Sequence, residues 1–121
     1  LRRHTGLEVM KVIKVAGPED PAAAGAYLEV ADWLMFDAKA PADLAGALPG
    51  GNALVFDWTL LGGEQWALPW MLAGGLDAAN VAAAVRLSGA STVDTSSGVE
   101  DAPGRKNPSK IKMFLDAVAA L

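Results

Sequence analysis

Residues 69–98 read PWMLAGGLDAANVAAAVRLSGASTVDTSSG, and this stretch decides the fold. The apolar run at 69–73 is short and ends at the pair Gly74-Gly75, which is typical of a buried strand followed by a turn. The Ala-rich segment 78–87 predicts a helix, and residues 91–94 predict a second short strand. A strand, a helix and a strand in succession predict a βαβ unit with parallel strands.

The rest of the chain repeats this alternation. Runs rich in β-branched and aromatic residues predict further strands, and the Ala-rich or polar segments between them predict helices. The expected strands are 9–15, 33–37 and 53–56, and the expected helical segments are 22–30, 43–47, 59–61 and 109–121. Together with the two strands above, this pattern predicts one α/β domain over residues 1–121. An open doubly wound sheet and a portion of a closed barrel both fit the pattern.

Composition excludes several classes of function. The 121 residues carry a net charge of -4, whereas nucleic acids and anionic membranes are bound by clustered Lys and Arg. The chain has no cysteine and a single histidine, so disulfides, thiolate chemistry and zinc sites are not expected. No apolar run approaches the ~18 residues of a membrane span, and the cytoplasm is the expected compartment. A small anionic substrate stays open, because backbone N–H groups alone can hold a phosphate.

Asp37 follows directly on the apolar residues Met35 and Phe36 at the end of a predicted strand. Functional side chains of parallel α/β folds gather at the carboxyl ends of the strands. A carboxyl group that is partly withdrawn from water at such a position can act as a general acid. The alternative is a structural Asp that caps the next turn or pairs with Lys39.

Gly74 and Gly75 let the chain turn tightly and let a ligand approach the backbone closely. Asp77 is a good N-cap for the helix expected at 78–87, and the free N–H groups at a helix N-terminus favour a phosphate. Taken alone, the segment is equally compatible with a plain turn between a strand and a helix.

The segment 94–98, Asp-Thr-Ser-Ser-Gly, begins at the end of the next predicted strand. Ser and Gly in such a loop can form a concave set of donors for an anion, although a polar surface loop would look the same. The ends of consecutive parallel strands are neighbours in space, and in (β/α)₈ barrels the loops after strands 7 and 8 commonly form a phosphate site. The two loops together predict such a site far more specifically than either loop alone.

Six short motifs occur in a fixed order along the chain. They are Phe36-Asp37-Ala38-Lys39, Pro49-Gly50-Gly51-Asn52, Phe56-Asp57-Trp58, Leu72-Ala73-Gly74-Gly75-Leu76, Val93-Asp94-Thr95-Ser96-Ser97-Gly98-Val99-Glu100 and Pro103-Gly104-Arg105-Lys106. In this order they resemble the motifs of the phosphoribosylanthranilate isomerases. Residues 110–114 also match the last helix of that family, so the resemblance covers essentially the whole chain.

The resemblance implies the C-terminal portion of a single (β/α)₈ TIM-barrel domain. Residues 9–15 would be strand 4, and the segments that end at Asp37, Asp57, Ala73 and Asp94 would be strands 5 to 8. A complete barrel needs about 200–250 residues. We therefore expect a partial barrel, with parallel strands 4 to 8 and their helices, in which strands 1 to 3 and most of helix 3 are absent.

The resemblance also implies a reaction. It is the Amadori rearrangement of N-(5-phosphoribosyl)anthranilate to the aminoketose 1-(2-carboxyphenylamino)-1-deoxyribulose 5-phosphate in tryptophan biosynthesis. A general acid opens the sugar ring to a Schiff base, and a general base then removes the C2 proton, with no cofactor and no metal. Asp37 matches the general acid and Asp94 matches a polar residue of the substrate pocket. The residues that match the phosphate-binding loops are Gly74, Gly75, Ser96 and Ser97.

The chain departs from the family at two points. The general base of the family is a Cys at the end of strand 1, and this chain has no Cys. Ala53 stands where the family usually has a glycine, and its effect is left open. The expected partners are a small sugar phosphate and either a second copy of the chain or the missing N-terminal barrel part, but neither nucleic acid nor a membrane.

Two other functions compete with this reading. A partial barrel exposes strands 4 and 8 as open edges, which pair with other chains. The chain would then be a non-catalytic fragment that binds phosphate and self-associates or pairs with its missing part. A different sugar-phosphate barrel enzyme, such as a histidine-pathway isomerase or a pentose-phosphate epimerase, agrees less well with the motifs at 56–58 and 93–98.

Lys14 could reach the barrel mouth from strand 4 and assist binding. Several other residues have structural explanations. Asp57 is expected to cap the turn after its strand, and Glu100, Arg105 and Lys106 are expected to fix a loop through surface ion pairs of little energy. The tryptophans are expected to pack in the core rather than to stack on bases; they are Trp33, Trp58, Trp66 and Trp70.

Overall fold

β-Branched and aromatic residues build the central sheet of the computed structural model, which describes residues 2–38 and 55–121. Strand β1 (Met10–Val15) pairs in parallel with β2 (Trp33–Ala38), and β2 pairs in parallel with β3 (Trp70–Leu72). The α/β class and the parallel direction predicted from the sequence are therefore confirmed.

The segment expected as a strand at 91–94 joins this sheet through a single parallel bridge between Leu72 and Val93. The Leu72 amide donates to the carbonyl of Thr92 over 2.9 Å, and the Asp94 amide donates to the carbonyl of Leu72 over 2.8 Å. The loops that follow β3 and Val93 consequently start side by side, as the sequence predicted.

The prediction of five neighbouring parallel strands is wrong at one position. Val55 and Phe56, the described half of the strand expected at 53–56, belong to no strand, and β2 pairs directly with β3. The other expected features of this region lie outside the described residues; they are Lys39, the short helix at 43–47, the Pro49–Asn52 motif and Ala53.

Aromatic packing explains the direct pairing of β2 with β3. The ring of Phe36 in β2 lies 4.5 Å from that of Trp66 and 5.5 Å from that of Trp70, between ring centroids, and the two tryptophan rings lie 5.4 Å apart. Such aromatic pairs add to the energy of burial. The cluster holds the segment that ends in β3 against the edge of β2 where the strand at 53–56 was expected.

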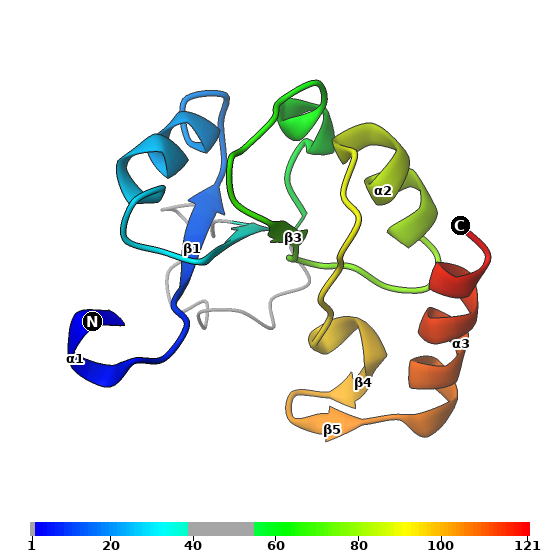
Figure 1. Ribbon diagram of the computed structural model, residues 1–121. Coiled ribbons are helices and arrows are strands. Elements are labelled where there is room, and N and C mark those ends of the chain that lie inside the picture. Colours follow the sequence, from blue (N-terminus) through cyan, green and yellow to red (C-terminus); the bar gives the residue numbers. More distant parts are fainter. Residues whose placement is uncertain (1, 39–54) are drawn as a thin grey trace, which may run out of the picture.

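Helices lie around the outside of the arc of strands in Figure 1. The remaining elements are α1 (Arg2–Thr5), η1 (Pro21–Tyr27), η2 (Trp58–Leu61), α2 (Val81–Ser88), η3 (Ser97–Val99), β4 (Glu100–Ala102), β5 (Arg105–Lys106) and α3 (Pro108–Ala119). The short antiparallel hairpin of β4 and β5 falls in the Gly- and Pro-containing loop, where the sequence predicted no strand.

Three helices differ in detail from the expectation. The segment predicted as a helix at 22–30 forms the shorter 3₁₀-helix η1, which contains the weak helix former Gly25. Helix α2 begins at Val81, one turn later than expected. Helix α3 begins one residue earlier than expected, because the Asn107 side chain accepts from the amides of Ser109 and Lys110 and caps it.

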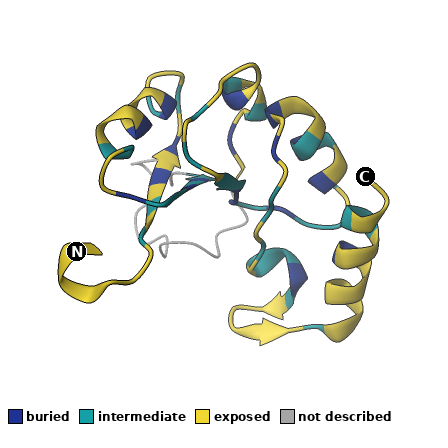
Figure 2. Cartoon of the chain, viewed as in Figure 1, coloured by how far each residue is buried: buried dark blue, intermediate teal, exposed yellow. Residues whose placement is uncertain are grey.

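The core lies between the sheet and these helices (Figure 2). Its largest fully buried side chains come from β2, η2, β3 and the loop after β3; among them are Leu34, Phe36, Leu61, Leu72 and Leu76. Trp58, Trp66 and Trp70 pack against this cluster, as expected, and Trp33 is half-buried. Burial of each large apolar side chain stabilises the fold by about 1.5–3 kcal/mol.

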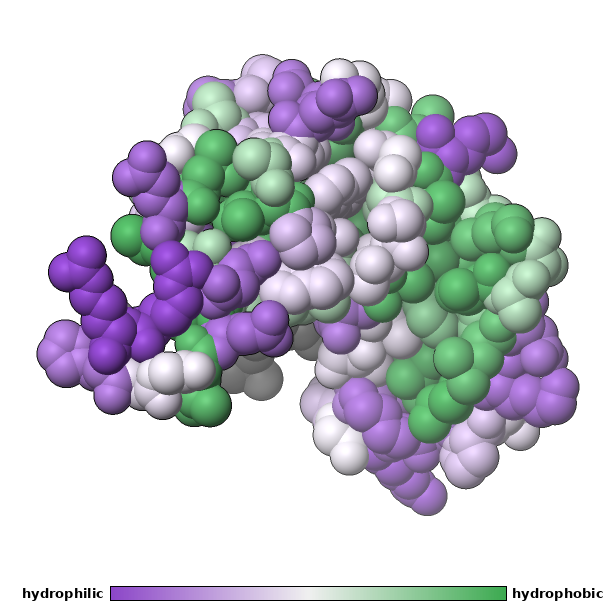
Figure 3. Space-filling view, in the orientation of Figure 1, coloured by the Kyte–Doolittle hydropathy of each residue, from purple (hydrophilic) through white to green (hydrophobic). Residues whose placement is uncertain are grey.

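Apolar side chains also remain on the surface. Figure 3 shows them gathered on the side of the molecule where α2 and α3 lie. Met113 and Leu115 of α3 are exposed, as are Met10 and Val12 of β1. Among the described helices, none combines the length and the hydrophobicity that crossing a bilayer requires.

Candidate active site

Asp37 and Gly74 lie against each other at the carboxyl edge of the sheet. Gly74 has a φ of +96°, and a Cβ placed on it would lie 2.8 Å from Oδ1 of Asp37 and 2.5 Å from the amide nitrogen of Ala38. The predicted general acid and the first predicted phosphate-binding residue are thus neighbours. Only a glycine leaves room for this close approach.

The carboxyl group of Asp37 is held at both oxygens. Oδ2 lies 2.5 Å from Nζ of Lys14, and Oδ1 accepts a 2.9 Å hydrogen bond from the amide of Ala38. The side chain is 18% exposed, so solvent still reaches it. The expected alternative partner, Lys39, lies outside the described residues. Asp37 is therefore oriented by its own strand and by a cation from β1.

Asp94 shares this edge with Asp37. The packed protein around its carboxyl group, and then the negative charge of Asp37, raise the pKa of Asp94 above its ordinary value of 3.8, while the charge of Lys106 opposes the shift. The residue as a whole is exposed. The negative charge of Asp37 thus contributes to the raised pKa of Asp94, an interaction that the sequence indicated only through the positions of both residues at strand ends.

Asp94→Asn is expected to raise the melting temperature slightly at neutral pH. Because the pKa of Asp94 is raised in the folded chain, the folded state binds this proton more tightly than the unfolded state. The free energy of unfolding then falls as the pH rises from 3.8 through the raised pKa, and the charged carboxylate costs stability above it. Thermal unfolding followed by circular dichroism would show the gain at neutral pH and its loss below pH 3.8.

Asp101→Asn is the matched control for this pH dependence. The hydrogen bond from Asn107, and then Lys110, lower the pKa of Asp101 below 3.8. Its contribution to stability is therefore present above that value and is lost as the pH falls through the lowered pKa. The Asn variant should melt lower than the parent at neutral pH. A lower melting temperature in Asp94→Asn as well would contradict the interpretation of Asp94.

Hydrogen bonds of Asp77 and Asn80 stabilise the turn at Gly74 and Gly75. Both residues have positive φ, +96° and +69°. Asn80 donates from Nδ2 to the carbonyl of Gly75 over 2.9 Å and accepts from the Asp77 amide, while Asp77 Oδ1 accepts from the amides of Ala79 and Asn80. Asp77 therefore caps the turn before α2 rather than α2 itself, which corrects its predicted role. Within the described part of the chain, no acceptor is paired with the amides of Gly74 and Gly75.

Ser96 and Ser97 follow on the neighbouring loop. Nζ of Lys106 donates to the carbonyl oxygen of Ser96 over 3.0 Å and to its Oγ over 3.2 Å, and it pairs with Glu100 Oε2 at 3.0 Å. The expected loop-fixing ion pair of Glu100 therefore involves Lys106. Ser97 begins η3. A positive charge thus lies beside the predicted phosphate-binding serines.

Thr95 and Gly98 join the two loops, and the sequence analysis missed both roles. Thr95 Oγ1 donates a 2.6 Å hydrogen bond to the carbonyl oxygen of Leu76. The backbone of Gly98 packs against the same carbonyl group, where a Cβ would overlap its oxygen. The only sequence signal was the glycine itself, placed three residues after a threonine at a strand end.

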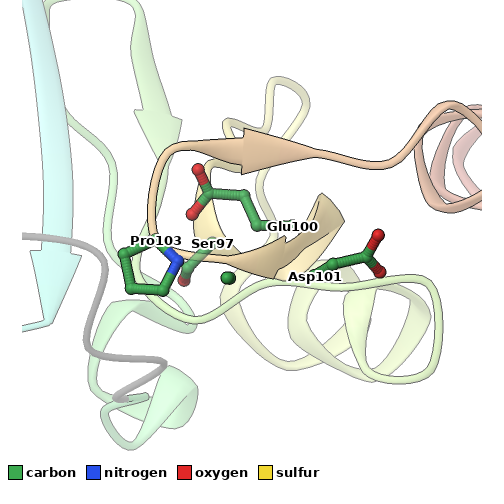
Figure 4. A pocket seen from close by; sticks show the side chains of 5 residues that line it. Ser97, Glu100, Asp101 and Pro103 are labelled. Atoms are coloured by element: carbon green, nitrogen blue, oxygen red, sulfur yellow. The ribbon is translucent and has the colours of Figure 1, made fainter.

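A shallow pocket of about 180 Å³ opens beside this loop. Ser97 lines it together with Glu100, Asp101, Ala102 and Pro103. Figure 4 shows that the side chains of Glu100 and Asp101 point in different directions. Because these two carboxylates line the pocket, it does not favour the binding of an anion. In the described ranges, no three His, Cys, Asp or Glu side chains gather in a way that could hold a metal ion. Asp57 caps η2 by accepting from the Thr59 amide, as expected.

Comparison with known proteins identifies the family. The family model described as N-(5'phosphoribosyl)anthranilate (PRA) isomerase matches residues 2–117. The N-(5'-phosphoribosyl)anthranilate isomerase of Rhodospirillum centenum is 59% identical over all of this chain and 56% of its own length. That of Parvibaculum lavamentivorans is 56% identical over 97% of this chain and 54% of its own length. The chain spans about half the length of the curated relatives it matches.

Solved structures agree with these sequence matches. A structure of monomers of the dimeric phosphoribosylanthranilate isomerase of Thermotoga maritima has a TM-score of 0.77 and 30% identity, covering 100% of this chain and 55% of that one. A phosphoribosylanthranilate isomerase in complex with reduced 1-(o-carboxyphenylamino)-1-deoxyribulose 5-phosphate has a TM-score of 0.71 and 28% identity, covering 98% of this chain and 52% of that one. The chain belongs to the N-(5'-phosphoribosyl)anthranilate isomerase family.

Proposed function

We propose that the chain is the C-terminal side of a (β/α)₈ barrel, to which β1, β2, β3 and the segment at 91–94 contribute strands. In the proposal, the complete cytoplasmic protein converts N-(5-phosphoribosyl)anthranilate to 1-(2-carboxyphenylamino)-1-deoxyribulose 5-phosphate. Membership of the isomerase family supports the reaction. The neighbour that carries a reduced carboxyphenylamino deoxyribulose 5-phosphate supports a sugar phosphate as the substrate. The reaction itself needs no cofactor.

The close approach of Gly74 to the Asp37 carboxyl group carries this proposal. A ligand whose phosphate meets the amides of Gly74 and Gly75 has its sugar next to Asp37. Ser96 and Ser97 would complete the phosphate site from the neighbouring loop. Anions are well held by free backbone N–H groups and hydroxyls together. Asp94 would line the same pocket beside Asp37.

In the proposed mechanism Asp37 gives its proton to the ring oxygen of the ribose. The bond between C1 and the ring oxygen breaks, and the electron pair on the anthranilate nitrogen forms the Schiff base. A general base then removes the C2 proton to give an enolamine, which tautomerises to the aminoketose. The chain has no Cys, so a thiolate base of the family type would come from the N-terminal part of the barrel.

An activity assay tests the proposed function. We expect the chain to be inactive alone and active when it is refolded with, or fused to, the N-terminal part of the Rhodospirillum centenum relative. The loss of phosphoribosylanthranilate fluorescence measures turnover. An inactive but folded and stable assembly would instead favour the non-catalytic fragment or another sugar-phosphate substrate.

Exposed surfaces favour the non-catalytic fragment as the second candidate. β1 pairs only with β2 among the described strands, and Met10 and Val12 on it are exposed. The apolar surface of α3, with Met113 and Leu115, is exposed too. Open strand edges and large apolar surfaces pair with other chains. Sedimentation at low concentration should then detect self-association of the chain alone, whereas a stable monomer would argue against this alternative.

A further inference from the structure

Lys14 and Asp37 face each other across the parallel ladder of β1 and β2, where they are register partners. Their neighbours Ile13 and Phe36 are also partners and are buried on the other face. Because side chains alternate along a strand, Lys14 and Asp37 project from the face opposite the core. The strand register therefore brings the ammonium group to the carboxylate.

The pair contributes little to the stability of the fold. The side chain of Lys14 is 43% exposed and that of Asp37 is 18% exposed. Ion pairs as exposed as this one contribute little to the free energy of folding. The clear consequence of the contact is geometric, because the 2.5 Å contact at Oδ2 and the 2.9 Å bond from the Ala38 amide at Oδ1 fix the plane of the carboxyl group.

We propose that Lys14 is the positioning residue of the acid Asp37, an inference that rests on the proposed function. Lys14 holds the Asp37 carboxyl in the orientation that faces Gly74 and the bound sugar. When Asp37 gives its proton to the ring oxygen, the nearby ammonium also stabilises the negative charge that appears on the carboxylate. Preorganised charges of this kind act mainly on the transition state. Lys14 itself neither gives nor takes a proton in this step.

The proposal predicts a loss in kcat rather than in KM. In the barrel completed with the Rhodospirillum centenum N-terminal part, Lys14→Met should lower kcat by about 10- to 100-fold, the cost of a misplaced reacting group. KM for phosphoribosylanthranilate should change by less than about threefold, because uniform binding is kept. Lys14→Arg should recover part of kcat, since it keeps the charge and can reach the carboxylate.

Lys11→Met is the matched control, because it removes the same charge from the same strand. Lys11 lies on the core-side face of β1, with Nζ 4.6 Å from the centre of the Tyr27 ring, and its register partner is Leu34. Its kcat should stay within about twofold of the parent, as for a substitution away from the chemistry. A loss equal to that of Lys14→Met would overturn the proposal, because charge removal anywhere on β1 would then suffice.

A double-mutant cycle with Asp37→Asn decides whether Lys14 acts through Asp37. The effect of Lys14→Met on single-turnover rates should vanish in the Asp37→Asn background. Equal losses in both backgrounds, or a change confined to KM, would make Lys14 an independent binding residue and overturn the proposal. If the completed parent shows no turnover, or if Asp37→Asn turns over as fast as the parent, the proposed function itself is wrong. That outcome differs from one in which the parent is active, Asp37→Asn is impaired and only the predictions for Lys14 fail.

Discussion

Asp37→Asn is expected to lower kcat of the completed barrel by about 10²–10⁴-fold, the usual contribution of a positioned general acid. The amide keeps the size of the side chain but has no acidic proton to give to the ring oxygen. It can still accept a hydrogen bond from the Ala38 amide, which bonds to Oδ1 in the parent. The variant should therefore lose proton transfer to the substrate while the geometry of the site is retained.

Binding is the readout that separates this loss from misfolding. The affinity for reduced 1-(o-carboxyphenylamino)-1-deoxyribulose 5-phosphate, measured by calorimetry, should stay within about tenfold, or 1.4 kcal/mol, of the parent. Gly74, Gly75, Ser96 and Ser97 are unchanged in this variant and are proposed to hold its phosphate.

Asp57→Asn provides a matched control at another predicted strand end. Asp57 caps η2 through the Thr59 amide, and Asn caps helices about as well as Asp, so its replacement should change stability by less than about 0.5 kcal/mol. Turnover should be unaffected. Near-normal turnover by Asp37→Asn would remove Asp37 from the role of the acid.

The edge of the sheet that carries the candidate site could be predicted from the sequence. The runs that end at Asp37, Leu72 and Val93 are short and apolar, and parallel strands bring such ends to one edge. Local patterns suffice here, because the carboxyl ends of all parallel strands lie on the same side of a sheet. The sequence therefore predicted that Asp37 and Gly74 lie on the same side of the sheet. It did not predict that their atoms are in direct contact.

The order of strands could not be predicted in the same way. Periodicity identifies a strand but does not give its neighbour, and the pairing of β2 with β3 depends on the ring cluster of Phe36, Trp66 and Trp70. Phe36 and Trp70 are 34 positions apart in the sequence. Contacts of that range are a property of the packed molecule. Trp66 and Trp70 were correctly predicted to pack against the core, but that prediction does not show which strands they join.

The start of α2 was predicted wrongly because two nearby residues can each cap a helix. Asp77 and Asn80 are both good N-cap residues, and only the packed structure selects the Asp77 carboxylate for the turn and the Asn80 amide for Gly75. The contact of Lys14 with Asp37 is set by the register of the two parallel strands β1 and β2. The sequence alone did not give that register, so the contact could not be predicted.

Gly98→Ala is expected to separate the two loops of the proposed phosphate site. A Cβ on Gly98 would overlap the carbonyl oxygen of Leu76 and would lie 2.8 Å from its carbonyl carbon and 2.8 Å from Thr95 Oγ1. Backbone atoms cannot move aside as a flexible side chain can, so the segment 95–98 must shift as a whole. The 2.6 Å hydrogen bond from Thr95 to Leu76 would be strained or lost with it.

Both stability and activity should respond to this shift. Overpacking costs typically about 1–3 kcal/mol, and misplacement of a binding loop by about 1 Å can cost 100-fold. We expect kcat/KM of the completed barrel to fall at least about 100-fold, mostly through KM, because the proposed phosphate ligands Ser96 and Ser97 move away from Gly74. Steady-state kinetics and thermal unfolding together measure the two effects.

Gly25→Ala is the control that separates a general cost of adding a methyl group from the specific clash. Gly25 lies in η1, and a Cβ there would meet nothing within 4 Å. Since alanine favours helical backbone over glycine by about 0.5–1 kcal/mol, this variant should keep its activity and melt at or slightly above the parent. Parent-like KM and melting temperature in Gly98→Ala would mean that the contact between 76 and 98 is dispensable. The neighbouring loops after β3 and Val93 would then not act as one phosphate site.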